Sequence, residues 1–496
     1  MSAHMTDPLL LGWLAVGGLL ALLCTGKVII PLAMWLTPVF LLHVARCTRA
    51  PGILLGIWLV LGAATAITNR GVLPIPGIGY IATSLMIPLA IPLAMLADRV
   101  LAPRLPGLAS TLVFPLAWVT IELLRTRALP SATWGSPAYT QYGNLPLMQI
   151  VSVTGLSGIV FLLGWFASVV SYVWDHGWAP EAGRAVVLPY ALVFGAVIAC
   201  GALRMARART DVQSIRVATI SYPKELFVRG EVTRFLSDEM DPAELPAMRE
   251  KVARLHAQYL EETRREARAG AALVVWPEEN LITLEEDEAA FLDAAKSLAR
   301  DERIYLLMGM GTVRHGAPHP LQNKAVLVTP SGQIEFAYHK SRLTPGWEAS
   351  KGEAGTERLP VTDTPYGRLA TAICFEMDFP QLIREVGVAR ADVLVAPSND
   401  WLEIKQLHPA MAVFRAIENG VSLVRATSSG ISVAVDPVGR VRSLSDDAAP
   451  NARIMVAHVP MRGMQTVYAK VGDLFGWLCV AGLLAAIGVA YLGPSP

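Results

Sequence analysis

Charged residues are scarce in this chain of 496 residues. Asp, Glu, Lys and Arg together make up 17% of it, and hydrophobic residues make up 53%. A soluble protein of this length would have about a quarter charged residues. The formal net charge of +1 gives no basic surface for nucleic acid, so we expect no nucleic-acid partner. The shortage of charge instead indicates a membrane protein.

Patterns that bind metals are also missing. The sequence contains no CxxC pair, no HExxH and no cluster of histidines, and zinc sites depend on such spacings. We therefore predict no metal site. Of the five cysteines, Cys24, Cys47, Cys200 and Cys479 lie in or beside apolar runs. Cys374 is the one cysteine that belongs to a polar part of the chain.

Long apolar runs account for the excess of hydrophobic residues. Eight of them are long enough, or nearly so, to cross a bilayer as helices. They cover residues 8–24, 28–45, 51–68, 77–97, 105–124, 147–174, 186–203 and 472–492. The first seven residues contain no Lys or Arg, so we predict a retained helix there and not a signal peptide. Basic residues are shared between the loops of both sides, so charge leaves the orientation open.

The stretch between the seventh and eighth runs has a different composition. It contains most of the charged residues, which indicates a soluble domain. We therefore predict a membrane domain of seven helices over residues 1–206, a soluble domain over 207–470 and a C-terminal membrane helix over 471–496. Seven spans place the soluble domain on the side opposite to the N-terminus.

Strand and helix patterns alternate within this soluble domain. Apolar, β-branched runs predict strands, among them 214–221, 272–278, 304–313, 368–374 and 392–398. Helical periodicity predicts helices at 245–267, 285–301, 380–389 and 405–419. Ser331-Gly332 predicts a hairpin turn between two further strands. This alternation is typical of a layered α/β fold with buried sheets.

Three of the predicted strands end in reactive side chains. They are Glu278 in "VVWPEEN", Lys340 in "YHKSRLTPGWE" and Cys374 in "AICFEMDFP". A thiol needs a base to become a nucleophilic thiolate, and a lysine can stabilise an oxyanion. Each residue also has a structural alternative, since a free cysteine is usually a small core residue. Spacing alone does not bring the three together.

Taken in order, and followed by "APSNDW", these motifs resemble those of the nitrilase superfamily. The resemblance implies a four-layer αββα sandwich with a Glu-Lys-Cys triad. In that triad Glu278 would be the general base, Lys340 the oxyanion stabiliser and Cys374 the nucleophile. The same resemblance implies Glu348 and Glu376 as supporting carboxylates.

The membrane part adds a closer resemblance. Residues 134–165 and 466–477, together with the eight apolar runs, resemble bacterial apolipoprotein N-acyltransferases. This resemblance implies that the cysteine takes an acyl chain from a membrane phospholipid as a thioester. It would then pass the chain to the N-terminal amine of a diacylated apolipoprotein. It further implies no metal or soluble cofactor. The family orientation implies an inner-membrane protein with its catalytic domain in the periplasm, and we expect a monomer.

Several positions depart from that family's pattern. Phe375 replaces the usual Tyr, Leu402-Glu403 replace Phe-Gly, and residues 218–227 lack the usual Gln-x-Asn segment with its nearby Trp. We expect Phe375, Asn399 and Trp401 on the substrate side. Three alternatives stay open. The first two are a membrane acyltransferase with a different amine acceptor and a membrane-tethered amidase of the nitrilase type. A third is a catalytically idle scaffold.

Overall fold

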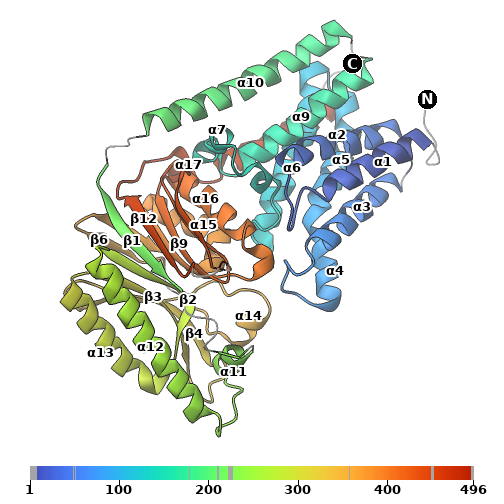
Figure 1. Cartoon of the computed structure of the whole chain (residues 1–496). Coiled ribbons are helices and arrows are strands. Elements are labelled where there is room, and N and C mark those ends of the chain that lie inside the picture. Colours follow the sequence, from blue (N-terminus) through green and yellow to red (C-terminus); the bar gives the residue numbers. More distant parts are fainter. Residues whose placement is uncertain are drawn as a thin grey trace. The chain divides into compact units, whose positions relative to one another are not determined.

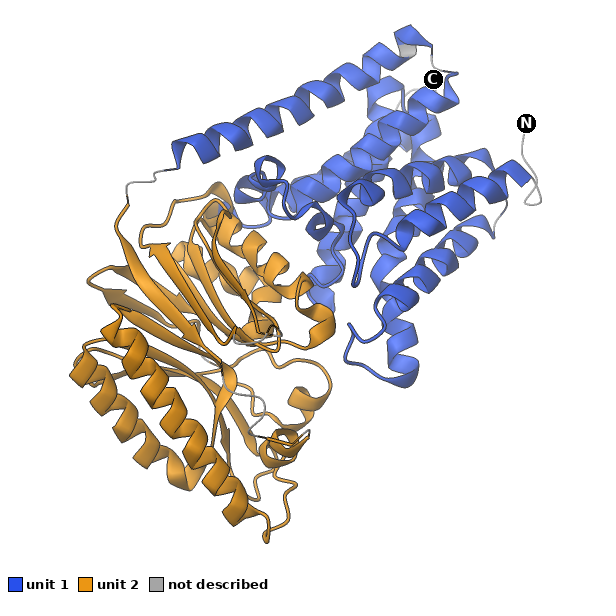
Figure 2. Cartoon of the chain, in the orientation of Figure 1, with its two compact units in different colours: residues 1–208, 471–496 blue, residues 209–470 orange. Residues whose placement is uncertain are grey.

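The computed structural model divides the chain into two compact units, shown in different colours in Figure 2. Unit 1 consists of residues 1–208 and 471–496, and unit 2 consists of residues 209–470. The structure describes residues 8–48, 50, 52–177, 179–208, 212–221, 227–228, 230–356, 358–447, 449 and 452–492. The segment 218–227, noted above for its departure from the family pattern, lies partly outside them because residues 222–226 are not described.

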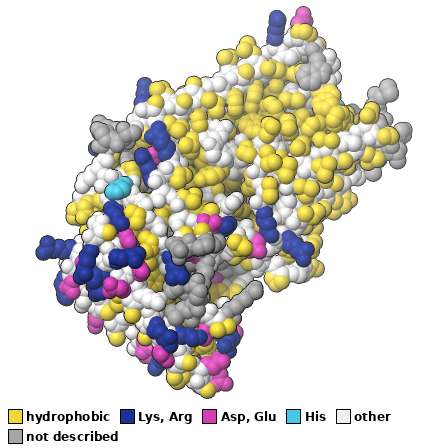
Figure 3. Space-filling view, in the orientation of Figure 1, with side chains coloured by type: hydrophobic (Ala, Val, Ile, Leu, Met, Phe, Trp, Pro, Cys, Tyr) yellow, Lys and Arg dark blue, Asp and Glu magenta, His cyan; other side chains and the backbone are white. Residues whose placement is uncertain are grey.

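Unit 1 is helical and apolar. Among the described residues, five helical segments are long and apolar enough to cross a membrane: 77–104, which contains α4 (Gly77–Met86) and α5 (Ala90–Leu101), α6 (Gly107–Ala128), α9 (Ser157–Asp175), 183–207 of α10 (Pro180–Arg207), and α18 (Leu474–Leu492). The shorter apolar helices are α1 (Pro8–Ala21), α2 (Pro31–Cys47), α3 (Ile53–Thr68) and the stretch 145–154. Figure 3 shows hydrophobic side chains covering most of the visible surface of this unit, whereas charged side chains gather over unit 2.

The apolar run 147–174 is not one helix. It contains the end of α7 (Leu145–Met148), all of α8 (Val151–Thr154) and most of α9. Gly155 follows α8 with a φ of +62°, a conformation that glycine adopts without steric cost and other residues rarely adopt. The prediction of one continuous span was therefore wrong here, because hydropathy does not register a backbone break.

Several charged side chains within unit 1 form ion pairs. Arg46 at the end of α2 donates to both oxygens of Asp98 on α5, at 2.8 and 2.9 Å. It also contacts Asp175 at the end of α9 at 3.3 Å. Ionisable groups among apolar helices need such partners. Through Arg46, these ion pairs join α2 to α5 and to the end of α9.

Unit 2 contains two six-stranded sheets. The first has the order β12-β1-β2-β3-β4-β5 and the second β11-β10-β9-β8-β7-β6. The strands of the first sheet are β1 (Ser214–Ile220), β2 (Leu273–Leu284), β3 (Tyr305–Val313), β4 (Leu321–Val328), β5 (Ile334–His339) and β12 (Ile454–Pro460). Those of the second are β6 (Val361–Thr364), β7 (Gly367–Thr371), β8 (Val393–Asn399), β9 (Ser422–Ser428), β10 (Ile431–Val435) and β11 (Val441–Asp446).

Helices cover both sheets, as Figure 1 shows. On the first sheet, α12 (Leu245–Arg268) packs against β1 and β2, and α13 (Glu285–Glu302) packs against β2 and β3. On the second, α16 (Leu407–Asn419) packs against β9 and β10, and α15 (Pro380–Val388) lies beside α16. The two sheets meet where β2 contacts β8 and β9. The α/β sandwich expected from the alternating pattern is therefore confirmed. Three short helices complete the unit, α11 (Glu231–Leu236), α14 (Trp347–Lys351) and α17 (Val467–Val471), whose last residue belongs to unit 1.

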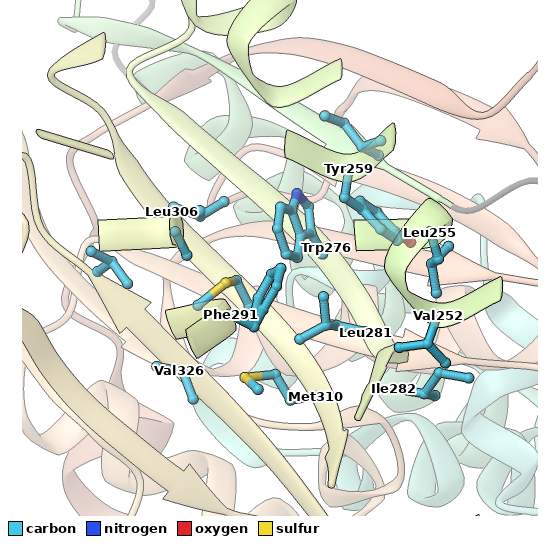
Figure 4. Close-up of a cluster of buried hydrophobic side chains, with 14 of the residues drawn as sticks. Val252, Leu255, Tyr259, Trp276, Leu281, Ile282, Phe291, Leu306, Met310 and Val326 are labelled. Atoms are coloured by element: carbon cyan, nitrogen blue, oxygen red, sulfur yellow. The ribbon is translucent and has the colours of Figure 1, made fainter. Parts of the chain in front are cut away.

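A core of buried apolar residues fills the space between the first sheet and its helices (Figure 4). Trp276 of β2 lies at its centre and is fully buried. Its ring packs against Tyr259 of α12, with ring centroids 4.6 Å apart, and its Nε1 donates to Thr263 Oγ1 at 3.0 Å. This packing holds β2 in place, and β2 also contains Glu278.

We expect Trp276→Ala to destabilise unit 2 by about 3–5 kcal/mol, because it leaves a large cavity in a packed core. The midpoint of thermal unfolding of the full chain in detergent micelles measures the loss. Val388→Ala is the matched control, since Val388 is 61% exposed and its truncation should change stability by less than about 0.5 kcal/mol. Equal midpoints for the two variants would contradict this picture of the core.

Candidate active site

Glu278 lies in the middle of β2, where the strand bulges. The pairing of β2 with the neighbouring β3 breaks between Trp276 and Leu281, and the next residue, Glu279, has a φ of +51°. The prediction that the strand ends at Glu278 was therefore wrong. Gly309 of β3 makes room for the bulge, because a Cβ there would lie 2.2 Å from the carbonyl oxygen of Pro277.

Lys340 directly follows β5 and is buried, with 1% of its surface exposed. Its Nζ donates to Glu278 Oε1 at 2.6 Å and to both oxygens of Glu348, at 2.9 and 2.7 Å. Burial opposes the charge, but the two carboxylates outweigh it and hold the pKa of Lys340 well above its ordinary value. Lys340 is therefore a buried ammonium group between two carboxylates.

Glu348, on α14, holds this arrangement from a second side. Its Oε1 accepts from Asn323 Nδ2 at 2.7 Å, and the same amide also donates to Glu278 Oε1 at 2.7 Å. The backbone N–H of Thr344 donates to Glu348 Oε2 at 2.7 Å. Burial opposes its charge, but the pKa of Glu348 is lowered by Lys340 and by these hydrogen bonds. Glu278, Lys340 and Glu348 thus form one hydrogen-bonded group.

Cys374 begins the short 3-10 helix η5 (Cys374–Asp378), three residues beyond the end of β7. It was predicted to end a strand, and the structure corrects this. Its φ of +45° is rare for residues with a side chain and costs on the order of 1–3 kcal/mol. Such strain persists only where neighbouring contacts hold it, and it is often found at functional sites.

Glu376 supplies those contacts. Its Oε2 accepts from the backbone N–H of Ile373 at 2.7 Å. Its Oε1 accepts from the hydroxyl of Tyr338 at 2.7 Å and from the backbone N–H and hydroxyl of Ser341, at 2.7 and 2.8 Å. The turn that contains Cys374 is therefore fastened to the loop that contains Lys340.

The thiol of Cys374 is neutral at ordinary pH. Burial and the charge of Glu278 raise its pKa to about 11, while a hydrogen bond with His408 and the charge of Lys340 act in the opposite direction. Its Sγ lies 3.7 Å from the carbonyl oxygen of Asn399. The thiol thus needs a base before it can attack, and Glu278 is a carboxylate close enough for its charge to raise the pKa of the thiol.

Three residues expected on the substrate side lie near this turn or at the end of β8. The ring of Phe375 meets Phe379 edge to face, with centroids 5.2 Å apart. Asn399 ends β8 and accepts through Oδ1 from Ser428 Oγ at 2.9 Å, and Trp401 is half-buried two residues later. Asn280 of β2 donates to the same Ser428 hydroxyl at 2.8 Å, so this chain of hydrogen bonds links the two sheets beside the site.

Sequence reasoning missed two further residues at the site, Asp400 and His408. Cys374 Sγ, an oxygen of Asp400 and a ring nitrogen of His408 all lie within 4.8 Å of one another, and all three residues are buried. Asp400 stands in the motif "APSNDW", but nothing in the sequence pattern signals that His408, on a helix that begins at Leu407, reaches the same place.

Such a group of ligand atoms could bind a cation, but a guanidinium group already fills that role. Arg425 of β9 donates to both oxygens of Asp400, at 2.7 and 2.9 Å, and its Nη2 lies 2.8 Å from His408 Nδ1. Burial opposes the charge of Asp400, but Arg425 and His408 lower its pKa to about 2. A metal ion at this point would meet a fixed positive charge.

Both parts of the chain match known families. The pattern of the carbon-nitrogen hydrolases matches residues 241–468, and that of the apolipoprotein N-acyltransferase N-terminal domain matches residues 16–169. An apolipoprotein N-acyltransferase of Geobacter metallireducens is 29% identical over 457 residues, which are 86% of this chain and 82% of that one. Another, from Azotobacter vinelandii, is 28% identical over 407 residues, which are 76% of this chain and 73% of that one.

Solved structures match more distantly. An amidase from Nesterenkonia sp. has a TM-score of 0.40 and 17% identity, and the match covers 54% of this chain and 97% of that one.

The pH dependence of Cys374 alkylation tests the electrostatics of the site. Iodoacetamide reacts with the thiolate, so with a pKa of about 11 the rate should rise about tenfold per pH unit through pH 10. Mass spectrometry of the peptide that contains Cys374 measures the rate. N-acetylcysteine in the same buffers is the reference, and its rate should level off above an ordinary thiol pKa of about 8.5. A plateau for Cys374 below pH 9 would contradict a neutral resting thiol.

The bulge at Glu278 predicts unequal effects for two glycines of β3. Gly309→Ala places a Cβ against the backbone of Pro277 and Glu278, and such overpacking typically costs about 1–3 kcal/mol. Gly311→Ala is the matched control, because its nearest neighbour is the flexible end of Leu236 at 3.0 Å. Thermal unfolding of both full-length variants checks this, and a Gly311→Ala midpoint as low as that of Gly309→Ala would contradict it.

Proposed function

The chain belongs to the apolipoprotein N-acyltransferase family, and from this membership we propose that it transfers an acyl chain from a membrane phospholipid to the N-terminal amine of a diacylated apolipoprotein. The observation that supports this most directly is the meeting of Glu278, Lys340 and Cys374 in one buried site. The relatives are named for N-acyl transfer to an apolipoprotein, and the chemistry of these groups suits such a reaction.

In the first half of the reaction, Cys374 is the nucleophile. Glu278 takes the thiol proton, and the sulfur attacks the ester carbonyl of the phospholipid, which forms a tetrahedral oxyanion. Lys340 stabilises this oxyanion, a contribution of about 3–4 kcal/mol for a single well-placed donor. Collapse breaks the ester C–O bond, and Glu278 returns its proton to the departing lysophospholipid oxygen. A thioester on Cys374 remains.

In the second half, the free amine of the acceptor attacks the thioester. Glu278 accepts a proton from the amine nitrogen as the new amide bond forms, and Lys340 again faces the oxyanion. The C–S bond then breaks, and the sulfur leaves and regains its proton. Glu348 keeps Lys340 oriented throughout, because both of its oxygens accept from the ammonium group that also donates to Glu278.

The membrane part would bring both lipid substrates to this site. We propose that eight apolar segments cross the bilayer, namely the five that are long enough by themselves and the three shorter helices α1, α2 and α3. The short helices α2 and α3 have 17 and 16 residues, which is near the lower limit for a span, and α1, with 14 residues, is shorter than that limit. By the family resemblance, this is the bacterial inner membrane and unit 2 faces the periplasm.

We also propose which residues contact the substrates and that the protein is a monomer. Phe375, Asn399 and Trp401 would contact the lipid substrates near the opening of the site. All the groups of the triad come from one chain, so the reaction needs no second copy and we propose a monomer.

The test is to incubate the purified full chain with a phospholipid of one defined acyl chain and to measure the intact mass. We expect an increase by that acyl group, mapped to Cys374 and reversed by hydroxylamine. Cys374→Ala should remain unmodified, whereas the matched control Cys200→Ala, at an exposed cysteine of α10, should be acylated like the wild type.

The acceptor is identified in the same assay. Addition of a diacylated lipopeptide with a free N-terminus should remove the acyl group from Cys374 and yield a triacylated peptide. Discharge to water alone would support a tethered amidase instead. Equal masses for wild type and Cys374→Ala, with phospholipid present, would refute the proposal.

A further inference from the structure

The imidazole ring of His408 is enclosed by charged groups beside Cys374. Its Nδ1 lies 2.8 Å from Asp400 Oδ1 and 2.8 Å from Arg425 Nη2. Its Nε2 lies 3.5 Å from Asp378 Oδ1. These groups come from η5, from the segment after β8 and from β9, and each is at most 4% exposed. Cys374 Sγ, an oxygen of Asp400 and a ring nitrogen of His408 lie within 4.8 Å of one another, so the ring lies beside the thiol in a dry, charged environment.

The charges around this ring favour its protonated form. Asp378 and Asp400 contribute two negative charges, and Arg425 contributes one positive charge. A neutral imidazole would leave one uncompensated negative charge among fully buried groups, which is costly, whereas an imidazolium balances it. Burial and Arg425 oppose the charge of His408, but Asp378 and Asp400 outweigh them and hold its pKa well above the ordinary value.

The triad by itself does not supply the positive charge that a thiolate needs. The ammonium group of Lys340 is already matched by two carboxylates, Glu278 and Glu348, both within 2.7 Å. The negative charge of Glu278 raises the pKa of the Cys374 thiol further, after burial. A second cation close to the sulfur would offset this, and the hydrogen bond between His408 and Cys374 acts in that direction.

We propose that His408 acts on the reaction as a permanent imidazolium whose ring N–H donates to Cys374 Sγ and stabilises the thiolate as it forms and as it leaves. This inference rests on the proposed role of Cys374 as the nucleophile. The thiol proton goes to Glu278, the imidazolium keeps its own protons, and no further reactant is needed. Asp400 and Asp378 are positioning residues that hold the ring charged, and Arg425, which opposes that charge, fixes the carboxylate of Asp400.

The test compares the alkylation of Cys374 by iodoacetamide in the full-length wild type and in His408→Gln, between pH 7 and 10. Glutamine keeps a neutral donor but removes the charge, so we expect alkylation to be about tenfold slower at each pH, as for a thiol pKa raised by about one unit. Glu278→Gln should act in the opposite sense and speed alkylation, because it removes a negative charge that opposes the thiolate.

A matched control separates this effect from a loss of fold. His256 of α12 is also partly buried, and its Nε2 contacts the carbonyl oxygen of Ile282 at 3.0 Å, so His256→Gln should leave the alkylation profile unchanged. An unchanged profile in His408→Gln would overturn the proposal. Alkylation needs no lipid, so this result is independent of the acylation assay, in which failure at Cys374 would refute the proposed function itself.

A measurement on the wild type covers the case in which His408→Gln does not fold. Ring nitrogen-15 NMR of histidine-labelled protein distinguishes imidazolium from neutral imidazole. The signal that shifts when Cys374 is alkylated belongs to the ring beside it, and we expect that ring to remain doubly protonated at pH 8.5. Titration of that signal near the ordinary histidine pKa of about 6.5 would overturn the proposal.

Discussion

The buried ammonium group of Lys340, held between Glu278 and Glu348, is the interaction on which the rest of the site depends. Removing these three charges from water costs several kcal/mol for each ion, and only close pairing repays it. The pairing in turn requires β2, the end of β5 and α14 to meet at one point. Since two carboxylates face one ammonium, the site keeps a negative charge, and this charge favours a neutral Cys374.

A second charged cluster beside the thiol offsets the negative charge of the first. His408, Asp400, Asp378 and Arg425 lie on the second sheet and its connections, whereas Glu278 and Lys340 come from the first sheet. The negative charge of the Glu278 cluster opposes ionisation of the Cys374 thiol, whereas the His408 cluster favours it. Glu376 fastens the turn of Cys374 to the loop of Lys340, so the sulfur and the Lys340 cluster are held together.

The helical unit provides an apolar environment, which the charged site of unit 2 lacks. The proposed acyl transfer between two lipids would involve tails that favour hydrocarbon and reacting groups that need a dry, charged site. The apolar helices of unit 1 suit the first requirement, and the sandwich of unit 2 satisfies the second. Sequence order reflects this division, since apolar helices both precede and follow the sandwich.

The sequence by itself determined the apolar helices, most strands and helices of the sandwich, and the three residues Glu278, Lys340 and Cys374, because periodicity and short motifs depend on neighbours along the chain. Only the tertiary structure decided that β2 bulges at Glu278, since the space comes from Gly309 on another strand. It also decided that Cys374 begins a strained turn, which distant donors to Glu376 hold in place. His408 escaped prediction for the same reason, because its charge is set by Asp400, Asp378 and Arg425, which packing alone brings to it.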